Sequence, residues 1–213
     1  MATIYVYTLD TMADWEIGYI TAELNSGRFF KKDAPEVSVK TVGIAKEPVK
    51  TMGGLTILPD CVIDDIAVND QSVLLLPGGN TWDDPKHSSI VKKAAELLSA
   101  GATVCAICGA TVALAHAGLL DYRPHTSNGA GFLDMFCPTY KGQNYFVDMP
   151  SVSDGTLITA SGTGALLWAK QITLKDVQEY MGHADIQMTA NIYGHLDHKR
   201  KMQLSETMSE RLF

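Results

Sequence analysis

The sequence lacks an apolar stretch of the roughly 18 residues that a membrane-spanning helix requires. No basic segment precedes the short apolar run at the N-terminus, so we expect residues 3–9 to form a strand and not a signal peptide. Cysteine is scarce as well, with only four among 213 residues. This number fits a protein of the reducing cytoplasm better than a disulfide-bonded secreted domain.

An excess of positive charge is also missing, because the formal net charge is −7. This balance argues against a nucleic acid or an anionic membrane surface as a partner. A chain of this length can bury roughly 70% of its unfolded surface, so it needs no disulfide or metal to stabilise its core. We expect one α/β domain, with or without an appendage, and no metal or cofactor.

What the sequence does contain is a short apolar run, 104–107, that leads directly to Cys108 and then to a run of small and apolar residues. The first run predicts a buried strand and the second a buried helix. Ala106 and Ala110 lie two residues to either side of Cys108, which is the spacing of a nucleophile elbow with cysteine in place of serine. A sulfur at that helix N-terminus is favoured as a thiolate. The alternative is a buried, inert core cysteine.

A second apolar run, 72–76, ends at Pro77, Gly78 and Gly79. Two glycines after a strand permit a tight turn that exposes backbone N–H groups. Beside the Cys108 turn, the N–H groups of Gly79 and Gly109 can form an oxyanion hole, with Gly78 also in the substrate site. Taken alone, the same turn is an ordinary connection from a strand to a helix.

Strands and helices alternate along residues 1–172, which predicts a mostly parallel sheet with helices on both faces, a three-layer α/β sandwich. Ligands of such sheets bind beyond the carboxyl ends of the strands, where Glu16, Gly79 and Cys108 all fall. We expect strands at 3–9, 37–42, 73–76, 104–107, 145–152 and 156–160, a hairpin within 48–59, and helices at 14–30, 85–101, 109–118 and 130–137.

Together these stretches resemble the ThiJ/PfpI superfamily, whose domains have the flavodoxin-like fold of class I glutamine amidotransferases. The glycine turn and the cysteine turn match it in order and spacing, and three further matches lie at 11–16, 117–128 and 155–162. The resemblance implies that Cys108 is the nucleophile and that Glu16 is the acidic residue that meets it. His125 matches the histidine that faces the cysteine in many members.

Each implied role has an alternative. Burial would raise the pKa of Glu16, and a protonated Glu16 could donate to the sulfur; otherwise it is a solvated residue in a first helical turn. His125 is either the base of a dyad or a loop histidine. His116 lies about 12 Å along the helix axis from Cys108, too far to touch the sulfur. Cys105 and Cys108 have the spacing of a redox pair or half a zinc site, but Cys105 falls inside the predicted strand.

Residues 173–213 do not continue this pattern and are expected to form a short helical appendage. Residues 174–195 resemble the end of a phage-type tyrosine recombinase, in which His183 and Tyr193 match the catalytic histidine and the DNA nucleophile. The cations that this chemistry needs upstream are absent, so we expect no nucleic-acid partner. Apolar stripes in this segment are expected to dock away from Cys108 or on a second subunit, and they favour a homodimer.

The sequence thus predicts a cysteine-dependent hydrolase or lyase, similar to intracellular proteases and amidases or to glyoxalases. Its substrate would be a small amide, a peptide or a reactive carbonyl. Glutaminase chemistry is disfavoured because residues 140–172 contain no histidine. The alternative is a non-catalytic stress-response or redox-sensing protein that uses the same cysteine, since a sensor needs only an exposed thiol of low pKa.

Overall fold

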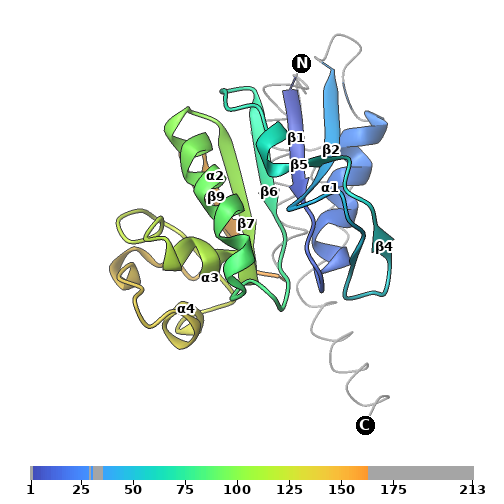
Figure 1. Ribbon diagram of the computed structural model, residues 1–213. Coiled ribbons are helices and arrows are strands. Elements are labelled where there is room, and N and C mark those ends of the chain that lie inside the picture. The colour runs from blue at the N-terminus through green and yellow to red at the C-terminus, as the bar shows by residue number, and fades with distance from the viewer. Residues whose placement is uncertain (1, 29, 31–35, 163–213) are drawn as a thin grey trace, which may run out of the picture. The chain divides into compact units, whose positions relative to one another are not determined.

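The computed structural model describes residues 2–28, 30 and 36–162. These residues form a seven-stranded sheet of order β5-β2-β1-β6-β7-β9-β8 (Figure 1), in which every neighbouring pair is parallel except β8 and β9. In chain order the strands are β1 Ala2–Tyr7, β2 Val37–Gly43, β5 Cys61–Val62, β6 Ser72–Leu76, β7 Thr103–Ile107, β8 Ser151–Asp154 and β9 Leu157–Ala160. The predicted flavodoxin-like α/β fold with a mostly parallel sheet is confirmed.

The strand order determines where a ligand can bind. Without the edge strands β5 and β8, the parallel strands run in the order 2-1-3-4-5, which is the flavodoxin-like arrangement. The direction of winding reverses between β1 and β6. The crevice beyond the carboxyl ends of these two strands is therefore the expected ligand site.

The central strands are apolar because both of their faces are covered. The side chains of Leu74, Leu75 and Leu76 in β6 are at most 1% exposed, and Val104 and Ile107 in β7 are fully buried. Parallel strands in the middle of a sheet are typically such unbroken apolar runs. These two runs are the ones that the sequence analysis placed before the glycine turn and before Cys108.

Helix α1, Asp14–Ser26, follows β1 and packs against β2, while α2, Ser88–Ser99, and α3, Gly109–His116, pack against β7. Figure 1 shows α2 and α3 in front of β7. The remaining elements are short: the 3₁₀ turns η1 Ile63–Asp65, η2 Pro85–His87 and η3 Gln143–Tyr145, helix α4 Phe132–Phe136, and the predicted antiparallel hairpin of β3 Val49–Lys50 with β4 Thr56–Ile57.

Most predicted elements differ from the observed ones by one to three residues at an end, and two differ more. The strand expected at 145–152 is β8, which begins only at Ser151, because the chain before it pairs with His125 and not with β9: His125 N donates to Tyr145 O, and Val147 N donates to His125 O. The helix expected at 14–30 ends at Ser26. Gly27 caps it in the left-handed conformation, φ 57°, which glycine adopts without steric cost.

The predicted boundary at residues 172 and 173, the recombinase-like segment with His183 and Tyr193, and the apolar stripes of 173–213 all lie outside the described residues. Among the residues that the structure does describe, none of the helices is long and apolar enough to span a membrane.

Candidate active site

Cys108 forms the sharp turn between β7 and α3. Its backbone has φ 54° and ψ −122°, a strained conformation for a residue with a side chain. Three hydrogen bonds hold the turn: Cys108 N donates to Ala160 O, and Thr111 donates to Cys108 O from its backbone N and, at 2.6 Å, from its hydroxyl. The thiol is half-buried. The strained turn lies at the carboxyl end of β7, so the sulfur is at this edge of the sheet.

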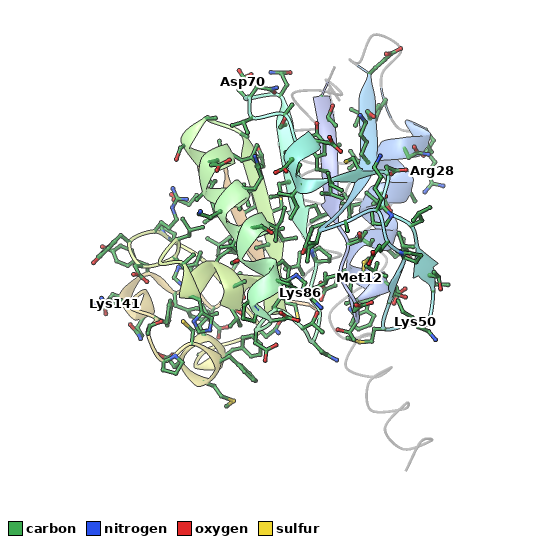
Figure 2. All side chains as sticks on the ribbon, viewed as in Figure 1. Met12, Arg28, Lys50, Asp70, Lys86 and Lys141 are labelled. Atoms are coloured by element: carbon green, nitrogen blue, oxygen red, sulfur yellow. The ribbon has the colours of Figure 1, made fainter. Side chains whose placement is uncertain are left out.

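Glu16 reaches the same place from the first turn of α1. Its side chain is only 2% exposed, and its Oε2 accepts the backbone N–H of Gly78 at 2.5 Å. The turn from β1 into α1, where Figure 2 labels Met12, is tied to the same glycine, because Ala13 N donates to Gly78 O at 2.9 Å. The structure thus brings the turns after β1 and β6 together.

Two glycines leave room for the carboxyl and the sulfur to meet. A Cβ at position 78 would lie 2.8 Å from both Cys108 Cβ and Glu16 Oε1. A Cβ at position 162 would lie 3.0 Å from Glu16 Oε1 and 3.3 Å from Cys108 Sγ. Glu16 Oε1 itself is buried without a hydrogen-bond partner in the described structure that satisfies normal geometry. It lies beside the sulfur, where only a shared proton can satisfy it.

The electrostatics of this pair follow from its burial. Burial raises the pKa of Glu16, against the opposing effect of the Gly78 N–H. Burial likewise raises the pKa of the Cys108 thiol, and the charge of Glu16 raises it further, whereas the hydrogen bond from Asn128 lowers it. The sequence led us to expect a depressed thiol pKa from the helix N-terminus, and the desolvation of the sulfur acts in the opposite direction. Both shifts favour retention of one proton by the pair.

Asn128, and not His125, faces the sulfur. Asn128 Nδ2 lies 3.0 Å from Cys108 Sγ, and its Oδ1 accepts the backbone N–H of Gly162 at 2.9 Å. His125 is fully buried, with Nδ1 2.7 Å from Arg123 O and Nε2 2.5 Å from Tyr140 Oη. Because a carbonyl oxygen only accepts, Nδ1 carries the proton and Nε2 accepts from Tyr140.

The expectation that His125 and Cys108 form a catalytic dyad is therefore corrected. Both ring nitrogens of His125 make hydrogen bonds within its own loop region, to Arg123 O and to Tyr140 Oη. Burial also lowers the pKa of His125, which keeps the ring neutral. Sequence reasoning missed Asn128 and Gly162. Both lie in stretches that match the superfamily, but a histidine nearby was the more familiar partner for a cysteine.

The glycine turn after β6 lies against the start of α3. A Cβ on Gly109 would be 2.9 Å from Gly79 O and 3.5 Å from Gly79 N. Within the described residues, the Gly79 N–H donates to no other backbone group. Trp82 supports the turn by donating from Nε1 to Pro77 O at 2.9 Å. The N–H of Gly79 is thus available to a ligand next to Cys108.

The remaining cysteines and His116 lie elsewhere. Cys105 is fully buried within β7, and none of the four cysteines forms a disulfide bond. His116 Nδ1 is 3.4 Å from Cys137 Sγ, so this histidine does not serve Cys108. Within the described ranges, there is no group of three or more His, Cys, Asp or Glu side chains that could hold a metal ion.

Comparison with known proteins identifies the family of this chain. The model of the DJ-1/PfpI family matches residues 2–174. The chain belongs to the DJ-1/PfpI family. A relative from Bacillus subtilis (strain 168), named "Uncharacterized protease YoaZ", is 48% identical over 172 residues, which are 81% of this chain and 82% of that protein. Protein dj-1beta of Drosophila melanogaster is 32% identical over 149 residues, or 68% and 74% of the two chains.

The fold comparison gives the same family. The crystal structure of a thiJ/pfpI family protein from Bacillus anthracis superposes with a TM-score of 0.85 at 41% identity and covers 97% of each chain. The DJ-1/PfpI assignment supports the resemblance stated for residues 1–172. The recombinase resemblance of the C-terminal segment has no support from these relatives.

Proposed function

We propose that this DJ-1/PfpI protein is a cysteine-dependent hydrolase or lyase that acts on a small amide, a peptide or a reactive carbonyl, with Cys108 as the nucleophile. The observation that carries the proposal is the strained backbone of Cys108, which holds Sγ beside the buried Glu16 carboxyl and near the Gly79 N–H. Strain of this kind persists where the surrounding structure holds a functional group in place.

The chemistry begins with the form in which Glu16 holds the shared proton and Cys108 is a thiolate. The thiolate attacks the carbonyl carbon, a C–S bond forms, and the π electrons move to the oxygen. The N–H groups of Gly79 and Gly109 stabilise this oxyanion. For an aldehyde, the Glu16 proton then passes to the oxygen and gives a hemithioacetal.

For an amide, the same proton goes to the leaving nitrogen as the C–N bond breaks, which leaves a thioester on Cys108. Water then attacks the thioester and gives a proton to the Glu16 carboxylate, and the C–S bond breaks to restore the thiolate. Glu16 carries the proton in both reactions because Asn128 has none to exchange at neutral pH. The name of the Bacillus subtilis relative, "Uncharacterized protease YoaZ", is in keeping with the hydrolytic route.

The test is a parallel assay of amide hydrolysis and of glyoxal consumption with the wild-type protein, Cys108→Ser and Cys61→Ser. Cys61 is a matched control because it lies on the edge strand β5, remote from the glycine turn in the sheet order. We expect turnover of at least one substrate class by the wild type and by Cys61→Ser, and none by Cys108→Ser. Equal turnover by the two serine variants would exclude Cys108 as the nucleophile.

A second candidate function is redox sensing by the same thiol. It is favoured by one observation: among the described residues, no imidazole contacts Cys108 Sγ. A sensor needs no base, only a thiolate that an oxidant can reach. Peroxide treatment distinguishes the two functions. A sensor would be oxidised at Cys108 while the wild-type protein turns over neither an amide nor glyoxal.

We also propose that the protein is a cytoplasmic homodimer. Its four cysteines form no disulfide bond, which fits a reducing compartment. Helix α1 and the hairpin segment are joined where Asp14 accepts the backbone N–H of Gly53. Both carry exposed apolar side chains, namely Trp15 and Tyr19 on α1 and Met52, Leu55 and Leu58 in the hairpin segment. Exposed apolar side chains that gather on one surface are typical of protein contact surfaces.

A further inference from the structure

The amide of Asn128 can adopt only one orientation in this site. The backbone N–H of Gly162 is a donor without acceptor capacity, so the Asn128 atom that faces it at 2.9 Å must be the oxygen. The atom 3.0 Å from Cys108 Sγ must then be the NH₂ group. The sulfur therefore accepts a hydrogen bond from a group that cannot take its proton.

The segment that carries Asn128 is held rigidly. Thr126 N donates to Thr159 Oγ1 at 2.9 Å and Thr126 Oγ1 donates to Met149 O at 2.7 Å. The Ser127 and Thr111 hydroxyls lie 2.6 Å apart, and both side chains are at most 1% exposed. Because the Thr111 proton goes to Cys108 O, Ser127 must donate to Thr111. Asn128 is thus joined to the cysteine turn through buried hydroxyls.

We propose that Asn128 is the positioning residue of the nucleophile: through Nδ2 it holds Cys108 Sγ and stabilises the thiolate, without accepting or releasing a proton. The inference rests on the proposed function in so far as the thiolate is the attacking species. In this proposal the amide of Asn128 occupies the position beside the sulfur that the sequence analysis suggested for His125.

The consequence is a site in which the Glu16 carboxyl and the Cys108 thiol are the two groups that can give up or take up a proton near neutral pH. From α1, the titratable group that faces the sulfur is Glu16. The segment before Asn128 contributes His125, whose nitrogens bond Arg123 O and Tyr140 Oη. The glycine turn, α3 and the end of β9 present only backbone and hydroxyl groups to Cys108 in the described structure.

The experiment measures the rate of Cys108 alkylation by iodoacetamide against pH, site by site, in full-length protein. Asn128→Asp is the informative variant, because a carboxylate oxygen still accepts the Gly162 N–H while the donor to the sulfur is lost. Asn128→Ala removes both contacts. Asn144→Ala, at an exposed asparagine of the same region, is the matched control.

We expect the alkylation profile of Asn128→Ala to shift to higher pH by about one unit, and its rate at neutral pH to fall about three- to tenfold, because a hydrogen bond to a charged acceptor is lost. Asn128→Asp should fall further, because a second carboxylate faces the thiolate. Asn128→His should restore the donor and add an ionisation near the ordinary imidazole pKa of about 6.5. Asn144→Ala should match the wild type.

Alkylation needs no natural substrate, so the two proposals fail separately. If the wild type turns over neither substrate class but Asn128→Asp shifts the alkylation profile, the proposed function is wrong and the role of Asn128 stands. If the wild type is active and Asn128→Asp, folded by circular dichroism, keeps the wild-type profile, the role of Asn128 is wrong.

Discussion

The Glu16 carboxyl is anchored on Gly78. The Gly78 N–H binds Oε2 at 2.5 Å, and Oε1, next to the Cys108 sulfur, has no conventional hydrogen-bond partner among the described residues. One oxygen is thereby committed to the backbone and the other to the proton that the two residues share. The arrangement depends on the absence of a side chain at position 78.

Gly78→Ala should therefore abolish the site. The added Cβ would meet Cys108 Cβ and Glu16 Oε1, each at 2.8 Å. Overpacking of this kind costs about 1–3 kcal/mol of folding free energy. Urea unfolding should show this loss, together with slow alkylation of Cys108. Gly18→Ala is the control: a Cβ there meets nothing within 4 Å, and alanine in a helix is more stable than glycine by about 0.5–1 kcal/mol. Equal stability of the two variants would contradict the packing argument.

Glu16→Gln should separate thiol reactivity from turnover. The Gly78 N–H will select the amide oxygen, so the NH₂ group replaces Oε1 beside the sulfur. A permanent donor without negative charge should move the alkylation profile of Cys108 to lower pH. Turnover should fall by about 10²-fold or more, because the proton carrier is lost. Slower alkylation with unchanged turnover would contradict the shared-proton model.

The same variant should be more stable at neutral pH. Burial raises the folded-state pKa of Glu16 above its unfolded value of about 4.3. Between the two values the folded state binds more protons than the unfolded state, so the free energy of unfolding falls as pH rises through this interval. Thermal melts of the wild type and Glu16→Gln across pH should show the wild type losing stability relative to the variant as pH rises.

His125 should contribute to stability and not to the chemistry. Burial lowers its folded-state pKa, so protonation favours the unfolded state and stability is lost as pH falls below the unfolded value of about 6.5. His125→Gln should melt at a lower temperature near neutral pH and show a weaker dependence between about pH 5 and 7. Its Cys108 alkylation profile should keep the wild-type shape. Loss of an ionisation from that profile would restore His125 as the base.

The homodimer proposal predicts that a charge on the hairpin weakens self-association. Leu55 is 61% exposed, and Leu55→Glu would place a carboxylate within the apolar group at the hairpin and α1. Sedimentation should then show more monomer. Met135→Glu, at a methionine of α4 that is 75% exposed, is the control and should sediment like the wild type. A monomeric wild type, or equal effects of both changes, would contradict an interface at this surface.

The sequence predicts those strands and helices whose residue patterns lie within the element itself. The runs before Gly78 and Cys108 are central strands because only unbroken apolar segments fill the middle of a parallel sheet. The sequence predicts a strand that already begins at residue 145, but the chain before β8 pairs with His125, and that pairing depends on residues distant in sequence. Asn128 was missed for the same reason. Its orientation depends on the Gly162 N–H, which is distant in sequence and comes close to Asn128 only in the folded chain.

Cys108 as the nucleophile is the central claim of this account, and titration of activity with iodoacetamide tests it most directly. Residual turnover of the substrate found in the parallel assay would be plotted against the modified fraction of each cysteine, measured by peptide mass spectrometry in the same samples. We predict that activity falls in proportion to Cys108 modification and reaches zero while Cys61, Cys105 and Cys137, which are buried, remain unmodified. Full activity in protein whose Cys108 is completely alkylated would contradict the account.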